Sequence, residues 1–124
     1  MRTSSLDIGK VISERIEKIL PTFPLVAEQG TPFPFATYQR TEMNFVDVKR
    51  NICIQESINI DVNIVTDNYT QSIELAKKVK EELDQIGGLS ERGVEIENTY
   101  MINGYERYTD GAYIQTLTFR IEVN

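Results

Sequence analysis

The 124-residue sequence contains no histidine, no tryptophan and only one cysteine, Cys53. Without histidine, the chain lacks the commonest general base and the commonest transition-metal ligand. A lone cysteine forms no disulfide within the chain, so we expect a hydrophobic core to supply the stability, as suits a reducing compartment. These absences argue against catalysis, and we predict that the protein is not an enzyme and holds neither a metal nor a cofactor.

Long apolar runs are also missing, and the N-terminus lacks a basic segment followed by an apolar stretch. We therefore expect an intracellular protein that neither spans a membrane nor carries a signal peptide. The formal charge of −6 disfavours sequence-specific binding to nucleic acid, which depends on neutralising phosphates with Lys and Arg. With 40% hydrophobic and 26% charged residues, the composition is that of one globular domain covering residues 1–124.

Two segments have the apolar periodicity of amphipathic helices. In the segment 8–20, apolar residues recur at three- and four-residue steps; Ser4 and Asp7 offer a cap, and Pro21 ends the helix. The second begins at Asn68, whose side chain suits an N-cap with Gln71 three positions later, and ends at the glycine pair 87–88.

Alternating apolar and polar residues predict the strands. The clearest case is the segment 57–64, in which four aliphatic residues alternate with Ser, Asn and Asp. Further strands are expected at 35–41, at 94–102 with Val94, Ile96, Tyr100 and Ile102 on one face, and at 116–123. The proline-rich segment 21–34 is expected to be irregular, whereas 42–55 is either a hairpin arm or a loop.

The order of these elements predicts an α+β fold, in which a mainly antiparallel four-stranded sheet carries both amphipathic helices on one face. The sequence does not decide whether 42–55 adds a hairpin arm to this sheet. Turn signals at Asn103-Gly104 and Asp110-Gly111 make the last two strands a hairpin, whose tip is rich in tyrosine at Tyr105, Tyr108 and Tyr113.

Searching for chemistry in the sequence gives little. No phosphate-binding glycine loop, nucleophile motif or zinc-type spacing occurs. Glu91, Glu95 and Glu97 lie close in sequence, and Asp61 would join them only if their strands were neighbours. Solvent exposure on a strand face explains these glutamates better than general acid–base catalysis, because the sequence supplies neither a third ligand nor the burial that would shift a pKa. The tip instead mixes tyrosine with Glu106 and Arg107, a composition that suits either a contact surface or the cover over one end of a core.

Three parts of the chain, between about Leu6 and Val123, together resemble the small tail-terminator, or tail-completion, proteins of long-tailed bacteriophages. They are the Pro-aromatic strand entry at 31–39, the aliphatic strand at 58–66 that runs into the helix at 72–79, and the final strand at 111–121. The resemblance implies a ring, usually of six subunits, that caps the tail tube and docks the head connector. It further implies a phage or prophage product that assembles in the host cytoplasm and ends in the virion tail. No catalytic residue follows from it.

On this reading the partners are other copies of the chain, the tail tube protein and the head connector protein. The expected interface anchors are aromatic or basic residues in strands or the tip: Phe35, Tyr38, Tyr105, Arg107 and Tyr108. The segment 42–55 is a candidate arm toward a neighbour. Three alternatives stay open: a head-completion or neck protein, a small-molecule-binding α+β module, and an enzyme that uses the glutamates.

Overall fold

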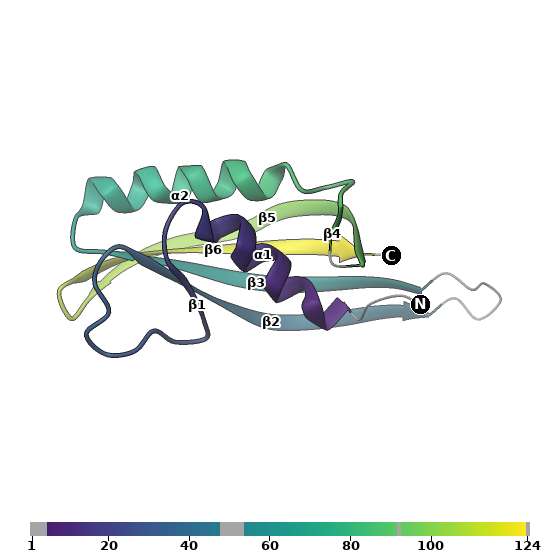
Figure 1. Cartoon of the computed structure of the whole chain (residues 1–124), viewed down its shortest axis with the longest axis horizontal. Helices are drawn as coiled ribbons and strands as arrows, with labels where there is room; N and C mark the ends of the chain where they lie inside the picture. Colours follow the sequence, from purple (N-terminus) through teal and green to yellow (C-terminus); the bar gives the residue numbers. More distant parts are fainter. Residues whose placement is uncertain (1–4, 48–53, 92, 124) are drawn as a thin grey trace.

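A computed structural model describes residues 5–47, 54–91 and 93–123 of the chain. Cys53 and Ser4, the predicted first cap, lie outside the described residues. Two helices and a sheet make up the fold, preceded by a short 3-10 turn at Ser5–Asp7 (Figure 1). The elements in chain order are α1 (Ile8–Glu17), β1 (Thr22–Pro24), β2 (Phe35–Asp47), β3 (Ile54–Thr66), α2 (Tyr69–Asp84), β4 (Ser90–Glu91), β5 (Val94–Thr109) and β6 (Ala112–Val123).

The α+β class is confirmed, but the four-stranded antiparallel sheet is wrong in its details. The sheet has six strands in the order β1-β2-β3-β6-β5-β4 and is mixed, because β1 runs parallel to β2. Sequence patterns miss β1 and β4 for the same reason: each has only two or three residues, which is too short for a periodicity. Backbone bonds secure β1 inside the proline-rich segment, where Ala36 N–H donates to Pro21 O at 2.8 Å and Leu25 N–H donates to Tyr38 O at 2.8 Å.

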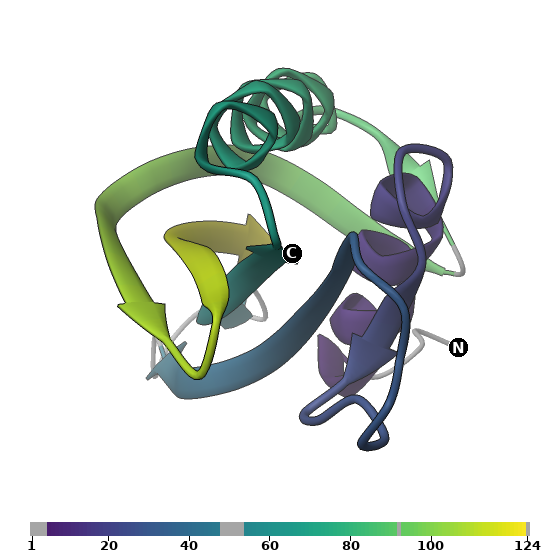
Figure 2. The ribbon, with the colours of Figure 1, turned by 90° about the vertical axis from the view of Figure 1, so that its left-hand side faces the viewer.

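The four long strands, β2, β3, β6 and β5, pair antiparallel with one another, and their register defines two faces. Opposite residues on paired strands share a face, so the row Arg40–Ile60–Phe119–Met101 projects to one side of the sheet. Ile60 and Phe119 of this row belong to the core beneath the helices, and we call this side the helix face. Figure 2, in which the left-hand end of Figure 1 faces the viewer, shows that the sheet is strongly twisted.

Both helices cover the helix face, as predicted. Helix α1 ends at Glu17, earlier than expected, and the chain continues in a turn in which Leu20 N–H still donates to Ile16 O at 3.1 Å. Asp7 occupies the N-cap of α1 without a capping side-chain bond. The predicted cap of α2 is confirmed, because Asn68 Oδ1 accepts from Gln71 N–H at 2.9 Å.

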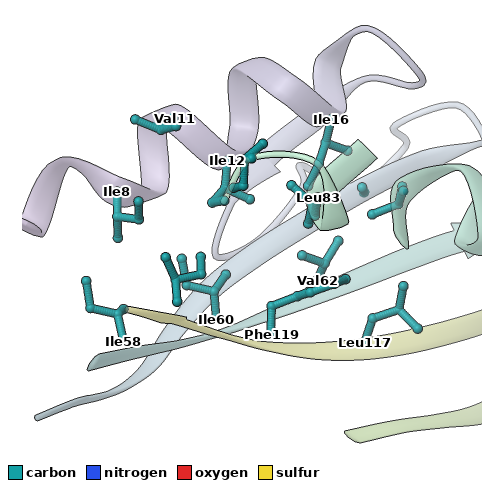
Figure 3. Packing of buried hydrophobic residues seen from close by; sticks show 14 of the residues in the cluster. Ile8, Val11, Ile12, Ile16, Ile58, Ile60, Val62, Leu83, Leu117 and Phe119 are labelled. Atoms are coloured by element: carbon teal, nitrogen blue, oxygen red, sulfur yellow. The ribbon is translucent and has the colours of Figure 1, made fainter. Parts of the chain in front are cut away.

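The main core joins α1, α2, β3 and β6. Figure 3 shows the buried aliphatic side chains of α1 and of Leu83 on α2 above those of β3 and β6, with Phe119 among them. The predicted alternation of β3 is confirmed, because Ile58, Ile60, Val62 and Ile64 are all buried. Burying these four side chains contributes roughly 6–12 kcal/mol before the loss of conformational entropy.

The predicted alternation of β5 is confirmed at its start and wrong further along. Val94 and Ile96 are buried, whereas Tyr100 and Ile102 are exposed. The register shifts between Ile96 and Asn98 and again beyond Met101, and each such bulge moves the following side chains to the other face. Met101 is consequently the residue that packs against the core, opposite Phe119.

Two further expectations concern the hairpins. The backbone on both sides of the segment 48–53 is a hairpin arm, since β2 pairs with β3 as far as Asp47 opposite Ile54. Asn103-Gly104 is not a turn, because both residues lie within β5 opposite Thr118 and Leu117. The turn is at Asp110-Gly111, where both residues have positive φ, and it lies at the opposite end of the sheet from the arm (Figure 1).

Candidate functional site

Both outer strands of the long sheet extend well beyond the short strands that cover them. On one side β4 pairs only with Val94 and Glu95, and Ile96 bonds through its N–H to Leu89 O and through its C=O to Gly88 N–H. The outer edge of β5 over 97–109 faces no strand in the described parts of the chain. On the other side β1 pairs only with 36–38, and among the described residues no strand faces the outer edge of β2 over 39–47. Uncovered edges of this length are ready to pair with another strand.

The uncovered part of β5 also exposes large side chains. Tyr100, Ile102, Tyr105 and Tyr108 are 47%, 50%, 52% and 62% exposed. Every residue from Ile102 to Asp110 is exposed. Aromatic and aliphatic side chains along an unpaired strand are typical of a contact surface between proteins.

At the tip of the β5–β6 hairpin, polar groups of α2, β5 and β6 meet in one cluster. Tyr69 of α2 donates its hydroxyl to the Glu106 carboxylate, at 2.9 Å from Oε2 and 3.1 Å from Oε1. Gln115 Nε2 donates to the same carboxylate at 2.9 Å and to Ser72 Oγ at 3.2 Å. The ring of Tyr113 lies between those of Tyr69 and Tyr108, with centroids 5.8 and 4.8 Å away. The cluster fastens the hairpin tip to α2.

The same cluster lines a shallow pocket of about 230 Å³. The hydrogen bond to Glu106, then desolvation and the negative charge of Glu106, raise the pKa of Tyr69 above its ordinary value. A raised pKa keeps the phenol protonated, so Tyr69 is a hydrogen-bond donor here and not a base. The pocket therefore presents tyrosine rings and a carboxylate, groups whose chemistry suits contact with a polar or cationic group.

A second hollow, of about 200 Å³, lies where α1 meets β1 and β2. Its walls include Tyr38, the exposed side chain of Leu25, and Gly9, where a Cβ would come within 3.2 Å of the Tyr38 ring. Lys10 and Arg40 add two cations, both exposed. This hollow is thus apolar with a basic rim, and it adjoins the uncovered edge of β2.

The sheet face away from the helices carries a small buried apolar cluster of Val65, Ala112 and Ile114, with Phe35 packed against it. Next to that cluster the face is polar, and short side chains are hydrogen-bonded across its strands. Thr116, 1% exposed, donates its hydroxyl to Asn63 Oδ1 at 2.7 Å, and Asn63 Nδ2 donates to Thr37 Oγ1 at 3.3 Å. In a neighbouring row Thr118 donates its hydroxyl to Asp61 Oδ1 at 2.6 Å. These bonds tie β2, β3 and β6 together and fix their register.

The five predicted interface residues fall into two groups. Phe35 and Tyr38 are partly buried: Phe35 packs on the rings of Phe23 and Phe33, and Tyr38 packs against the main core. Tyr105, Arg107 and Tyr108 are exposed and lie together near the hairpin tip. Whether any of the five contacts another subunit stays a prediction.

The glutamates do not form an acidic centre with Asp61. Glu95 and Glu97 are exposed on β5, whereas Asp61 lies on β3, and β6 runs between those strands. No group of three or more potential metal ligands occurs among residues 5–47, 54–91 and 93–123. Over the same residues, none of the helices is long and apolar enough to cross a membrane.

Sequence reasoning missed the pairing of Tyr69 with Glu106 and the basic rim formed by Lys10 and Arg40. Both depend on contacts between separate elements, and the first joins residues 37 positions apart. The only signal in the sequence was the tyrosine-rich composition of the tip, which located the cluster on β5 and β6 without its partner on α2.

Comparison with solved structures shows where this fold occurs. A chain from the virion of a native gene transfer agent particle is similar over 91% of this chain and 84% of its own length, with a TM-score of 0.61 and 13% identity. A second solved chain matches over 98% of this chain and 97% of its own, with a TM-score of 0.57 and 14% identity. No known protein family and no curated protein matches the sequence. At these identities the likeness shows a shared fold.

Proposed function

We propose that the protein is a structural component of a phage-like virion that assembles with copies of itself into a ring. The observation that carries this proposal is the shared fold with a chain of a gene transfer agent virion, which extends over 91% of the present chain. The uncovered edges of β2 and β5 supply surfaces for self-assembly. In this role the protein needs no reactive group and is not an enzyme.

The position in the virion that we propose is the end of the tail tube. A ring, most simply of six copies, caps the finished tube and offers a docking surface to the head connector. The resemblance of the segments 31–39, 58–66, 72–79 and 111–121 to tail-terminator proteins supports this position. The protein would assemble in the host cytoplasm, encoded by a phage or prophage, and remain in the tail.

Electron microscopy of particles made without this gene tests the position. Loss of a tail terminator gives tubes of uncontrolled length, whereas loss of a head-completion or neck protein gives tails of normal length that fail to join heads. Restoring the gene on a plasmid is the control, because it must return tails to their normal length. Unchanged, fully joined particles in its absence would remove the protein from both roles.

A small-molecule-binding role predicts different behaviour. A binding module would be a monomer whose unfolding temperature rises with ligand concentration. Thermal unfolding measured against a panel of metabolites, alongside the mass of the protein in solution, separates the two hypotheses. A persistent monomer that one metabolite stabilises would contradict the structural role.

A further inference from the structure

The two uncovered sheet edges match each other in direction. Successive neighbours in the order β2-β3-β6-β5 are antiparallel, so β2 and β5 point in opposite directions at the two edges. Consider two copies whose corresponding strands run in the same direction and whose helix faces lie on the same side. If the β5 edge of one copy meets the β2 edge of the other, the new pair is again antiparallel. Head-to-tail addition therefore continues the sheet from one subunit into the next.

The edges also match in charge on the helix face. Glu106 on β5 projects to this face, because its cross-strand partner Gln115 bonds to Ser72 of α2. Arg40 on β2 projects to the same face, opposite the buried Ile60. A negative side chain near one edge and a positive one near the other therefore lie on the same side of the sheet.

The opposite face repeats the match with the signs reversed. Arg107 on β5 pairs with Ile114, and Glu42 on β2 pairs with Asn59. Ile114 and Asn59 each follow or precede a residue of the helix face, so they and their partners project away from the helices. The positive charge is now on β5 and the negative charge on β2. Opposite charges across a strand pair are stabilising, while like charges are destabilising. When Glu106 lies opposite Arg40, Arg107 and Glu42 are diagonal neighbours on this second face, a distance that long side chains span. A second copy of this chain thus offers opposite charges to the β5 edge on both faces.

We propose that the uncovered edge of β5 pairs antiparallel with the uncovered edge of β2 of a second copy, in a register that sets Glu106 opposite Arg40. This proposal rests on the self-assembly in the proposed function and names the surfaces that carry it. Thr41 and Ile102 are the extra residues of the bulges in β2 and β5, and they have no direct partner in this register. The register then sets Tyr105 beside Glu42 and brings 99–107 against 39–47, within the stretches that β4 and β1 leave uncovered. Tyr100 and Ile102 then lose their solvent-exposed surface to the neighbour.

Because the two joined edges differ, this contact is heterologous, and repeated copies form a closed ring or an open chain. A symmetric contact of β5 with β5 would instead stop at a dimer and leave both β2 edges uncovered. The two arrangements differ in which pairs of positions come close together, and chemical cross-linking distinguishes them.

The test uses the full chain with its one cysteine replaced, Cys53→Ser, and new cysteines at Glu42→Cys and Tyr105→Cys. A short bismaleimide is added to the single variants and to the double variant. Head-to-tail pairing predicts a ladder of covalent oligomers from the double variant and, at most, traces of dimer from either single one. Strong dimer formation by Tyr105→Cys alone means that β5 pairs with β5 and overturns the proposal. So does the absence of any cross-link from the double variant at the highest concentration that stays in solution.

Charge reversal supplies an independent test. In a sedimentation assay Arg40→Glu and Glu106→Arg each weaken association at least about tenfold, and the double variant regains most of it. Tyr69→Phe is the matched control, since it removes the bond to Glu106 within the chain but keeps the charge at the edge, so association persists. Failure of the double variant to recover, with Tyr69→Phe normal and all variants folded by circular dichroism, overturns the proposed register.

The outcome is separable from that of the proposed function. If the ladder forms but particles lacking the gene are normal, the edge pairing stands and the role in the virion fails. If tails grow to uncontrolled length without the gene but the ladder and the charge rescue are absent, the virion role stands and this interface fails.

Discussion

Two isoleucines of β5, Ile96 and Ile102, are expected to respond differently to the same truncation. The alternation in the sequence places both on one apolar face, yet in the structure Ile96 is 2% exposed and Ile102 is 50% exposed. The register shifts in β5 are the cause. Comparing the two positions therefore tests the bulges directly, with the residue type and the strand held constant.

The expected magnitudes follow from burial. Ile96→Ala deletes buried methyl and methylene groups and leaves a cavity, at a cost of about 2–5 kcal/mol. Ile102→Ala removes groups that are half in solvent and leaves no cavity, so its cost is about 1 kcal/mol or less. For a chain of this size 1 kcal/mol shifts Tm by roughly 4 °C, and the two variants should differ in Tm by several degrees.

Urea unfolding followed by circular dichroism at low protein concentration, where self-association is minimal, measures both free energies. Ile96→Val and Ile102→Val form the matched control pair, because valine keeps the strand preference of isoleucine and isolates the effect of burial. We expect about 0.5–1.5 kcal/mol at Ile96 and close to zero at Ile102. Equal losses at the two positions, or a larger loss at Ile102, would refute the shifted register of β5.

Three further predictions concern single side-chain bonds. Asn68→Ala removes the acceptor for Gln71 N–H and should cost about 1 kcal/mol in thermal unfolding, whereas Asn68→Asp keeps the cap and the stability. Thr118→Val removes the hydroxyl that donates to Asp61 and should lower the free energy of unfolding by about 1–2 kcal/mol in a urea titration. Thr118→Ser keeps the hydroxyl, and an equally large loss in this variant would contradict the contribution of the bond. Because the pKa of Tyr69 is raised in the fold, its contribution to stability is present below the ordinary tyrosine pKa and is lost as pH rises through the raised value. Glu106→Gln should therefore return the last-titrating phenol toward the ordinary range in an ultraviolet titration, and an unchanged titration would show that Glu106 is not the cause.

Local patterns predicted the parts of the fold that depend on local sequence. Both helices, the cap at Asn68 and the alternation from Ile58 to Ile64 are confirmed because each follows from neighbouring residues along the chain. The strands β1 and β4 could not be predicted, since each exists only through pairing with a longer strand. The bulges of β5 escaped prediction for the same reason, because a register shift depends on the partner strand.

The candidate surfaces were predicted in part. Composition identified Tyr105, Arg107 and Tyr108 as surface residues, and the structure exposes all three. Partial burial distinguishes Phe35 and Tyr38 from them, and it depends on β1 and α1 packing nearby, which no local pattern reveals. The uncovered edges became visible only once the strand order was known.

The strong twist of the sheet gives the uncovered edges a geometric consequence. In a joint between two different edges, the rotation from one copy to the next is set by the angle between the edges of a single subunit. Only a rotation that divides a full turn evenly lets the last copy meet the first; any other angle yields a spiral filament that grows without limit. A small change in the twist of the sheet, for example through altered packing of α1 and α2 on it, would then be enough to alter the number of copies or to prevent ring closure.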